Sequence, residues 1–273
     1  MPEPQAADAP RQAAGWPQRI VCLTEETTET LYLLGEGERV VGVSGYTVRP
    51  PEARQKPRIS AYLTAKYDAI VELRPDLVLA FSDLQAEVTR ELVRRGLNVF
   101  TFNQRRVEEI FAMMAALARL VGAEARGCEL ERELRAGLAE ITAAAACFPR
   151  RPRVWFEEWP EPLIGGIGWV EDLIEVAGGE PLFPEMRGQA AAAERIRDPA
   201  TVVARDPEVI IASWCGRKVN RERIRDRAGW AETAAVRAGQ IHEIKSSYIL
   251  QPGPAALTEG VRQLHRILAQ AAG

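Results

Sequence analysis

The strongest constraint on the fold is a pattern of short apolar runs that alternate with helical segments, and this pattern occurs twice along the 273 residues. The first copy occupies residues 19–104 and the second occupies residues 148–273. Strands that alternate with helices form βαβ units around a mostly parallel sheet. The sequence therefore predicts an α/β protein with two Rossmann-like lobes.

Each lobe is defined by apolar runs bounded by turn residues. The first lobe has such runs at residues 19–23, 40–44, 77–81 and 98–102, and the second at residues 153–157, 209–213 and 240–244. Short continuous apolar runs are typical of strands that are buried on both faces of a parallel sheet. We therefore expect helices to cover both faces of each sheet.

Residues 105–147 lie between the two copies and contain little Gly or Pro. Apolar residues recur there at helical spacing, from Val107 to Val121 and again from Leu130 to Ile141. The pattern predicts a single long α-helix that joins the lobes; two helices joined near residues 122–127 fit it as well. Residues 1–18 are rich in Pro, Ala and Gln, and we expect them to form a disordered arm.

Composition limits the kinds of partner. The formal net charge is -3, which argues against a nucleic-acid groove because such a groove requires a basic surface. No apolar run approaches the roughly 20 residues that cross a bilayer, so we expect no membrane insertion. No basic segment followed by an apolar segment marks a secretory signal. Taken literally, the sequence predicts a cytoplasmic protein; a trimmed or misassigned start would make it periplasmic.

Motifs for catalysis and metal binding are missing from the sequence. It has no GxSxG, GxxxxGK[ST] or HExxH motif. The four cysteines, Cys22, Cys128, Cys147 and Cys215, do not have the spacing of a zinc site or a disulfide framework, and there are only two histidines. These observations favour a protein that is not an enzyme and has no metal site or intrinsic cofactor. An enzyme that has reused the fold remains an alternative, with Glu25, Glu157 or Cys215 as its active group.

Six aromatic residues follow apolar runs or lie in loops. They are Tyr46, Tyr62, Phe81, Trp159, Trp214 and Tyr248. Ligands of α/β proteins bind at the carboxyl ends of the strands, where aromatic rings supply apolar area with polar handles. The set predicts a ligand cleft between the lobes, whereas any one of these rings alone fits a packed loop equally well. Glu25 and Glu26 follow the first strand, and they either face this cleft or cap the next helix.

Six segments carry a resemblance to a known family. They are residues 19–24 (RIVCLT), 27–31 (TTETL), 41–46 (VGVSGY), 50–53 (PPEA), 70–78 (IVELRPDLV) and 177–180 (AGGE). In these segments the chain resembles the cobalamin- and iron-siderophore-binding proteins of ABC importers, and the resemblance extends over nearly the whole chain from Arg19 onward. It implies a type III periplasmic-binding-protein-like fold, in which one long helix joins two lobes.

Within that family the chain looks most like the cobalamin binders, which implies a corrinoid ligand. Tyr46 and Tyr62 fall where that group places a Tyr and a Trp against the corrin ring, and Phe81 falls at another aromatic position of the family. Ser247 stands where the family can place an acid that reaches the edge of the corrin, and Tyr248 is next to it. A ferric siderophore or haem on the same scaffold is the alternative ligand, and a cytoplasmic relative reused as a carrier or enzyme is the alternative role.

The resemblance also implies an ABC permease as a partner. The family docks on its permease through one acid on each lobe. Asp68 lies at the first of these positions, whereas Ala200 occupies the second and Asp198 is close to it. The resemblance thus implies docking through Asp68 and Asp198.

Overall fold

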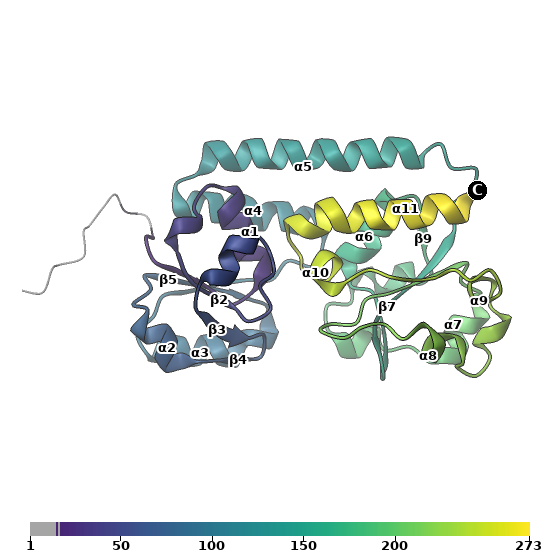
Figure 1. The fold of residues 1–273 in the computed structure, drawn as a ribbon, viewed down its shortest axis with the longest axis horizontal. Helices are drawn as coiled ribbons and strands as arrows, with labels where there is room; N and C mark the ends of the chain where they lie inside the picture. The colour runs from purple at the N-terminus through teal and green to yellow at the C-terminus, as the bar shows by residue number, and fades with distance from the viewer. Residues whose placement is uncertain (1–14, 16) are drawn as a thin grey trace, which may run out of the picture.

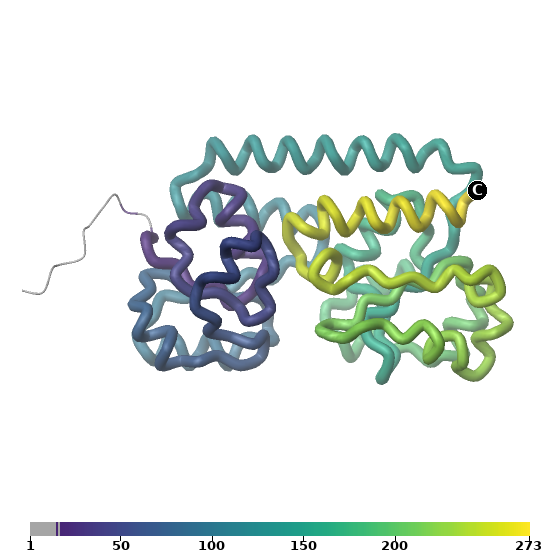
Figure 2. The backbone as a smooth tube through the Cα atoms, viewed as in Figure 1, coloured from purple at the N-terminus to yellow at the C-terminus, as the bar shows by residue number. Residues whose placement is uncertain are grey.

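The computed structural model describes Gly15 and residues 17–273 and arranges them in two α/β lobes that lie side by side (Figure 1). The arm predicted for residues 1–18 lies almost entirely outside the described residues. Figure 2 shows the purple and blue part of the chain in one lobe and the green and yellow part in the other. The predicted two-lobed α/β architecture is confirmed.

The first lobe contains a six-stranded sheet with the strand order β4-β3-β2-β1-β5-β6. All neighbours pair in parallel except β3 and β4. The strands are β1 (Ile20–Cys22), β2 (Val40–Ser44), β3 (Arg58–Ala61), β4 (Thr64–Ala65), β5 (Leu77–Phe81) and β6 (Val99–Phe102), and the helices are α1 (Glu25–Leu33), α2 (Tyr67–Glu72) and α3 (Ala86–Arg94). The two strands that the sequence did not predict, β3 and β4, are short and partly polar.

The second lobe contains a five-stranded sheet with the order β11-β10-β7-β8, and β9 pairs with the start of β7. Its strands are β7 (Arg153–Pro160), β8 (Leu163–Gly165), β9 (Glu180–Pro181), β10 (Val209–Ala212) and β11 (Ile241–Glu243). Its helices are α6 (Gly168–Val176), α7 (Pro199–Ala204), α8 (Arg221–Arg225), α9 (Ala234–Arg237), α10 (Ser246–Ile249) and α11 (Val261–Ala272), the last preceded by a π-helical turn at Ala256–Gly260.

Strand side chains alternate between two cores. In β10, Val209 and Ile211 belong to the core shared with α6 and α11, whereas Ile210 and Ala212 belong to the core on the opposite face of the sheet. Successive side chains of a strand point to opposite faces, so a strand buried on both faces appears as an unbroken apolar run. This is why the central strands were recognisable from the sequence.

Residues 105–147 form two helices, α4 (Val107–Val121) and α5 (Glu124–Ala145), so the single helix expected for this whole segment is not formed. Gly122 ends α4 in the left-handed conformation (φ 71°, ψ 31°), which glycine adopts without steric strain. The chain then turns back, and α5 runs across the top of both lobes (Figure 1). Its 22 residues span about 33 Å at 1.5 Å per residue. The helix that joins the lobes is therefore α5.

The largest cluster of buried apolar side chains includes residues of both lobes. Ile20 of β1 and Met114 of α4 belong to it, together with Val170 of α6 and Leu264 of α11. Because packed interiors are dense and resist deformation, a shared core limits how far the lobes move relative to each other. The two lobes are thus connected by packing as well as by α5.

Candidate ligand-binding site

Loops at the carboxyl ends of the strands in the two lobes meet along one surface, which we call the interlobe seam. Arg49, which follows β2, forms an ion pair with Glu29 of α1 (3.2 Å between Nε and Oε1). The same guanidinium donates to the carbonyl oxygen of Ser247 in the second lobe and lies 4.7 Å from the centre of the Tyr248 ring. Arg49 therefore connects the lobes directly.

A second connection lies deeper in the seam. Gln104, which follows β6, donates from Nε2 to the carbonyl oxygen of Pro252 at 3.0 Å. The next residue, Gly253, packs so closely on Glu26 that a Cβ at this position would be 2.5 Å from the Cβ of Glu26. Only glycine permits this approach, so the loop after α10 is fitted against the start of α1.

Two buried carboxyl groups, Glu25 and Glu26, open α1 immediately after β1. The hydroxyl of Ser44 donates to Oε1 of Glu25 (3.2 Å), and the hydroxyl of Thr24 donates to Oε1 of Glu26 (2.5 Å). Burial raises the pKa of Glu25, and burial together with the charge of Glu25 raises the pKa of Glu26 to about 8. Glu26 is therefore mostly protonated at neutral pH, so its carboxyl group is a hydrogen-bond donor as well as an acceptor.

Tyr62 follows β3 in a strained backbone conformation that a single side chain holds in place. Tyr62 has φ 53° and Ser82, after β5, has φ 65°. The side-chain amide of Gln85 donates to the carbonyl oxygen of Tyr62 (2.7 Å) and accepts from the backbone N–H of Phe81 (3.0 Å). Non-glycine residues in such conformations cost about 1–3 kcal/mol each and cluster at functional sites.

Charges from both lobes act on the same groups at the seam. Burial, followed by the charge of Glu26, raises the pKa of the Tyr62 phenol, and Glu158 at the end of β7 adds to this effect. Burial likewise raises the pKa of the Cys215 thiol, with Glu25 and Glu158 adding to it. Side chains from separate loops of the two lobes are thus electrostatic neighbours.

Several buried polar atoms at the seam have no hydrogen-bond partner among the described residues. They are Oγ1 of Thr47, Oε1 of Gln104, Nε of Arg105 and Oγ of Ser213. Each residue follows the carboxyl end of β2, β6 or β10 within three positions. A buried polar group without a partner costs about 1–3 kcal/mol, and a ligand that supplies the partner recovers this energy.

Four of the seven predicted ligand-binding residues lie at the ends of strands or in the loops that form the seam. Tyr46 is 51% exposed, and Tyr62 is partly exposed. Tyr248 lies under the guanidinium of Arg49, and Ser247 takes part through its carbonyl oxygen. Their role in ligand binding stays a prediction.

Of the other three, Phe81 and Trp214 are buried, whereas Trp159 is half-buried. Phe81 is 5% exposed. The guanidinium carbon of Arg105 lies over the Phe81 ring, 4.9 Å from the ring centre. Trp214 is 5% exposed and belongs to the core of the second lobe, where Trp159 also packs. The guanidinium of Arg217 lies 5.3 Å from the centre of the Trp159 ring. Trp214 and Phe81 therefore present little free surface to a ligand.

The buried position of Trp214 is explained by its contact with the buried ion pair of Glu157 and Arg227. Its indole N–H donates to Oε1 of Glu157 (3.0 Å), and Arg227 donates to both carboxylate oxygens of Glu157 at 2.6 and 2.9 Å. The neighbouring carboxylate of Glu158 instead pairs with Arg195. The two adjacent acids thus have separate partners, and the hydrogen-bonding capacity of Glu157 is used inside the core.

The two predicted docking acids are exposed, one on each lobe. Asp68 lies in the first turn of α2 and pairs with Arg95 (2.6 Å). Asp198 is the N-cap of α7, where its Oδ1 accepts from the backbone N–H of Ala200 (2.9 Å). Their role in docking stays a prediction.

The part of the chain that the structure describes contains no cluster of candidate metal ligands. There, no group of three or more His, Cys, Asp or Glu side chains is placed to hold a metal ion. The two histidines lie in regular elements and not in the loops of the seam, His242 in β11 and His265 in α11. Among residues 17–273, none of the helices combines the length and hydrophobicity needed to cross a membrane.

Sequence reasoning missed the polar residues that organise the seam. Arg49, Gln85, Gln104 and Arg105 were not singled out, although each follows the end of a strand within five residues. The signal that would have found them is the one used for the aromatic residues, namely position after the carboxyl end of a parallel strand.

Comparison with known proteins identifies the family. The sequence profile of the family described as "Periplasmic binding protein" matches residues 20–248. The chain belongs to the periplasmic binding protein family. This membership confirms the family resemblance that the sequence predicted.

Relatives and solved structures agree with this assignment. The chain is 25% identical to the uncharacterized ABC transporter substrate-binding lipoprotein YvrC of Bacillus subtilis, over 91% of this chain and 79% of that protein. It is 26% identical to the vitamin B12-binding protein of Vibrio parahaemolyticus, over 88% of this chain and 86% of that protein.

Two solved structures have the same fold. The periplasmic vitamin B12 binding protein BtuF of Vibrio cholerae has a TM-score of 0.74 and 23% identity, over 93% of this chain and 98% of that one. The periplasmic heme-binding protein RhuT from Roseiflexus sp. RS-1 has a TM-score of 0.81 and 23% identity, over 94% of this chain and 99% of that one. At this identity the structures establish the shared fold.

Proposed function

We propose that this protein captures a corrinoid of the cobalamin type at its interlobe seam and presents it to an ABC importer. Relatives named as a vitamin B12-binding protein and as an ABC transporter substrate-binding lipoprotein support the proposal. The observation that carries it is the meeting of loops from both lobes at the seam, where the Tyr62 phenol is electrostatically close to Glu26 of its own lobe and to Glu158 of the other.

The chemistry of these groups fits a corrinoid. A corrin ring has a broad apolar face and carries side-chain amides, which donate and accept hydrogen bonds. Tyr62 and Tyr46 offer ring area, and Oε1 of Gln104, which has no hydrogen-bond partner among the described residues, offers an amide acceptor. A site with apolar walls and a few placed polar groups binds and orients a ligand of this kind.

The same groups are less suited to haem, whose carboxylate side chains are anionic. The oxygen of Gln104 without a partner is an acceptor, so it suits an amide donor of a corrin better than a carboxylate. Haem iron also commonly takes a His, Cys, Met or Tyr side chain as its axial ligand, and neither described histidine belongs to the loops of the seam. Cobalamin carries its own lower axial base and does not require one from the protein.

Haem remains the second candidate because of Tyr46. Its ring is 51% exposed after β2, so its phenol oxygen is accessible as an axial ligand. Arg49 and Arg105 nearby in the seam are possible partners for haem carboxylates. The structural neighbour RhuT is a heme-binding protein.

The protein would work by capture and release, without chemistry on its cargo, and the corrinoid would be cargo and not a resident cofactor. We further infer that it acts outside the cytoplasmic membrane, as the relatives described as periplasmic or as lipoproteins do. Asp68 and Asp198, one on each lobe, are the candidate contacts with the permease.

The test is a calorimetric titration with cyanocobalamin, repeated with haemin. We expect saturable 1:1 binding of cyanocobalamin. Tyr62→Ala should weaken it about tenfold or more, because aromatic stacking contributes roughly 1 kcal/mol beyond area burial. Tyr67→Ala, which removes a tyrosine on α2 that packs under Arg95, is the matched control and should bind like the wild type. Haemin binding with no cyanocobalamin binding would replace this proposal with the haem alternative, and binding of neither would overturn both.

A further inference from the structure

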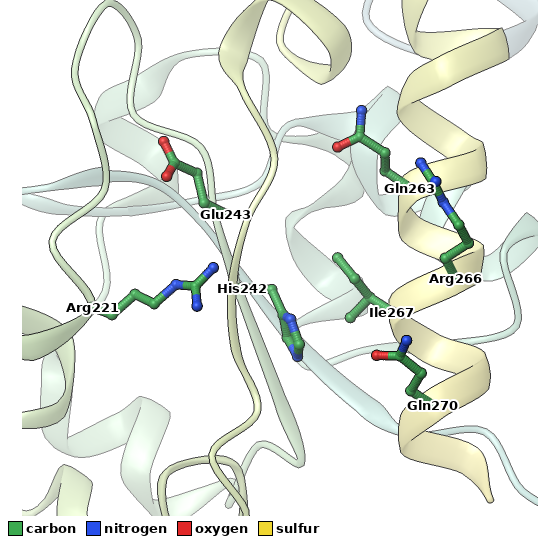
Figure 3. A pocket seen from close by; sticks show the side chains of 7 residues that line it. All are labelled: Arg221, His242, Glu243, Gln263, Arg266, Ile267 and Gln270. Atoms are coloured by element: carbon green, nitrogen blue, oxygen red, sulfur yellow. The ribbon is translucent and has the colours of Figure 1, made fainter.

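A polar hollow lies on the second lobe between β11 and α11, away from the Arg49, Gln104 and Glu26 contacts of the seam. It has a volume of about 290 Å³ and is lined by Arg221, His242, Glu243, Gln263, Arg266, Ile267 and Gln270. Figure 3 shows Arg221 extending toward His242 from one side, with the side chains of α11 on the other. A volume near 300 Å³ is at the lower end of the range of small-molecule sites.

Two arginines line this hollow, and one of them, Arg221, lacks a counter-ion, whereas Arg266 pairs with Glu259 (3.1 Å). Among the described residues, Arg221 forms no ion pair or hydrogen bond through its side chain, and its guanidinium is exposed. It lies near enough to His242 to lower the pKa of that imidazole, in addition to the larger effect of burial. The lowered pKa favours the neutral form of His242, so the positive charge of the hollow comes from its two arginines.

Of the two acids beside the hollow, Glu259 is paired with a cation, whereas Glu243 has only a backbone partner and keeps its charge. Oε1 of Glu243 accepts from the backbone N–H of Val219 (3.2 Å). Glu259, one turn before the lining residues of α11, accepts from Arg266 (3.1 Å) and from Gln263 (3.0 Å). Neither acid pairs with Arg221, so its donors remain available to a ligand.

The remaining wall supplies the other parts of a small-molecule site. The side-chain amide of Gln270 has no hydrogen-bond partner among the described residues, and it points into the same space (Figure 3). Ile267 and the half-buried ring of His242 provide an apolar surface. A guanidinium fork matches the geometry of a carboxylate or phosphate group, and an amide adds a neutral donor.

We propose that this hollow is a second binding site, for a small organic molecule that carries a carboxylate or phosphate group. Arg221 binds the oxyanion, Gln270 donates to it, and Ile267 with His242 contacts the apolar part. The site is separate from the corrinoid site proposed at the seam, and neither proposal depends on the other.

The chain has only two histidines, which makes a specific test available. The ring Cε1–H signals of His242 and His265 can be followed by NMR while inorganic phosphate or citrate is added at constant ionic strength, with sodium chloride as the reference salt. We expect the His242 signal, assigned with His242→Gln, to shift saturably with at least one of the two anions, while the His265 signal stays in place. The anion with the lower dissociation constant identifies phosphate or carboxylate as the preferred group.

Arg221→Gln should weaken this binding about tenfold or more, because it removes a charge-assisted hydrogen bond to the anion. Arg225→Gln is the matched control, since Arg225 is on the same helix and pairs with Asp226 (3.0 Å) without lining the hollow. Equal shifts of both histidines in sodium chloride and in the two anions would overturn the proposal. An Arg221→Gln protein that titrates like the wild type would overturn it as well. Because Arg221 is exposed, we expect Arg221→Gln to leave the urea midpoint unchanged, and this measurement separates loss of binding from loss of folding.

Discussion

Buried carboxyl groups divide into two kinds at the scale of single residues. Glu157 in the second lobe is paired with Arg227 and Trp214, whereas Glu26 at the seam has only hydroxyl and backbone partners. A paired buried carboxylate stays charged and depends on its partner, while an unpaired one tends to keep its proton. The paired carboxylate is therefore tested by removing its partner, and the unpaired carboxyl group by varying the pH.

The first prediction concerns the buried pair. Arg227→Met leaves the carboxylate of Glu157 buried without its cation, and we expect it to lower the free energy of unfolding by about 3–5 kcal/mol. Arg223→Met, which breaks an exposed pair with Glu161, should change it by no more than about 1 kcal/mol. Urea denaturation measures both values. Equal effects of the two substitutions would show that burial does not increase the contribution of the Arg227–Glu157 pair to the free energy of unfolding.

The second prediction concerns pH. The pKa of Glu26 is about 8 in the folded protein and near 4.5 when unfolded, so the folded state holds its proton more tightly. The free energy of unfolding should therefore fall as pH rises from about 4.5 to about 8 and level off above that. Glu171, with its pKa raised to about 8 by burial, contributes with the same sign. Glu26→Gln should reduce the slope without abolishing it, as measured by urea unfolding between pH 5 and pH 9. A slope identical to that of the wild type would contradict this assignment.

At this scale, the sequence revealed residue types more readily than their surroundings. The position of Trp214 after a strand was evident, and it suggested a ligand contact. Its indole instead donates to Glu157, whose carboxylate pairs with Arg227, 70 positions away from that acid in the chain. No local pattern encodes such a pair, so residue roles in the site were harder to predict than its location.

The α4–α5 turn shows what local signals determine at the scale of elements. Gly122 adopts φ 71° between the helices, and Gly137 lies in the middle of α5 with no atom within 4 Å of the place where a Cβ would be. The third prediction is that Gly122→Ala lowers the free energy of unfolding by about 1–2 kcal/mol, because of left-handed strain.

Gly137→Ala is the matched substitution. It should raise the free energy of unfolding by about 0.5–1 kcal/mol, since alanine loses less backbone entropy in a helix. Thermal and urea unfolding of the two variants give the comparison. The same sign for both would mean that backbone conformation does not distinguish these glycines.

Other elements were predicted to the extent that they were long or wholly buried. The central strands β5 and β10 stood out because every side chain in them is buried. In contrast, β3 has two exposed side chains among four, and β4 and β9 have two residues each, so they carry little periodic signal. The turn at Gly122 was one of two alternatives from the sequence, because apolar spacing continues through it.

Three kinds of connection hold the lobes together at the scale of the whole molecule. The core that includes α4, α6 and α11 is continuous, α5 runs along both lobes, and Arg106 binds Asp172 across the boundary at 2.7 and 2.8 Å. These connections lie on one side of the seam, at the helices. Motion is therefore expected at the loops that carry Arg49 and Tyr62, with little rotation of the lobes.

The fourth prediction tests this division. Arg49→Met removes the ion pair with Glu29 and the contacts with Ser247 and Tyr248, and it leaves the shared core intact. We expect faster dissociation of cyanocobalamin, by about tenfold, because a hydrogen bond of a charged group that closes the seam is lost. Stopped-flow displacement measures the rate.

The overall shape should respond much less than the rate does. The radius of gyration from small-angle scattering should differ by under about 1 Å between wild type and variant, with or without ligand, because packed cores resist deformation. Arg54→Met, which changes an exposed arginine in the 3-10 helix (Pro51–Gln55) after this loop, is the control and should leave both quantities unchanged. A large increase in the radius for Arg49→Met would show that this one side chain, and not the shared core, holds the lobes together. An unchanged dissociation rate would place the ligand away from Arg49, and the seam would then have to be reconsidered as the capture site.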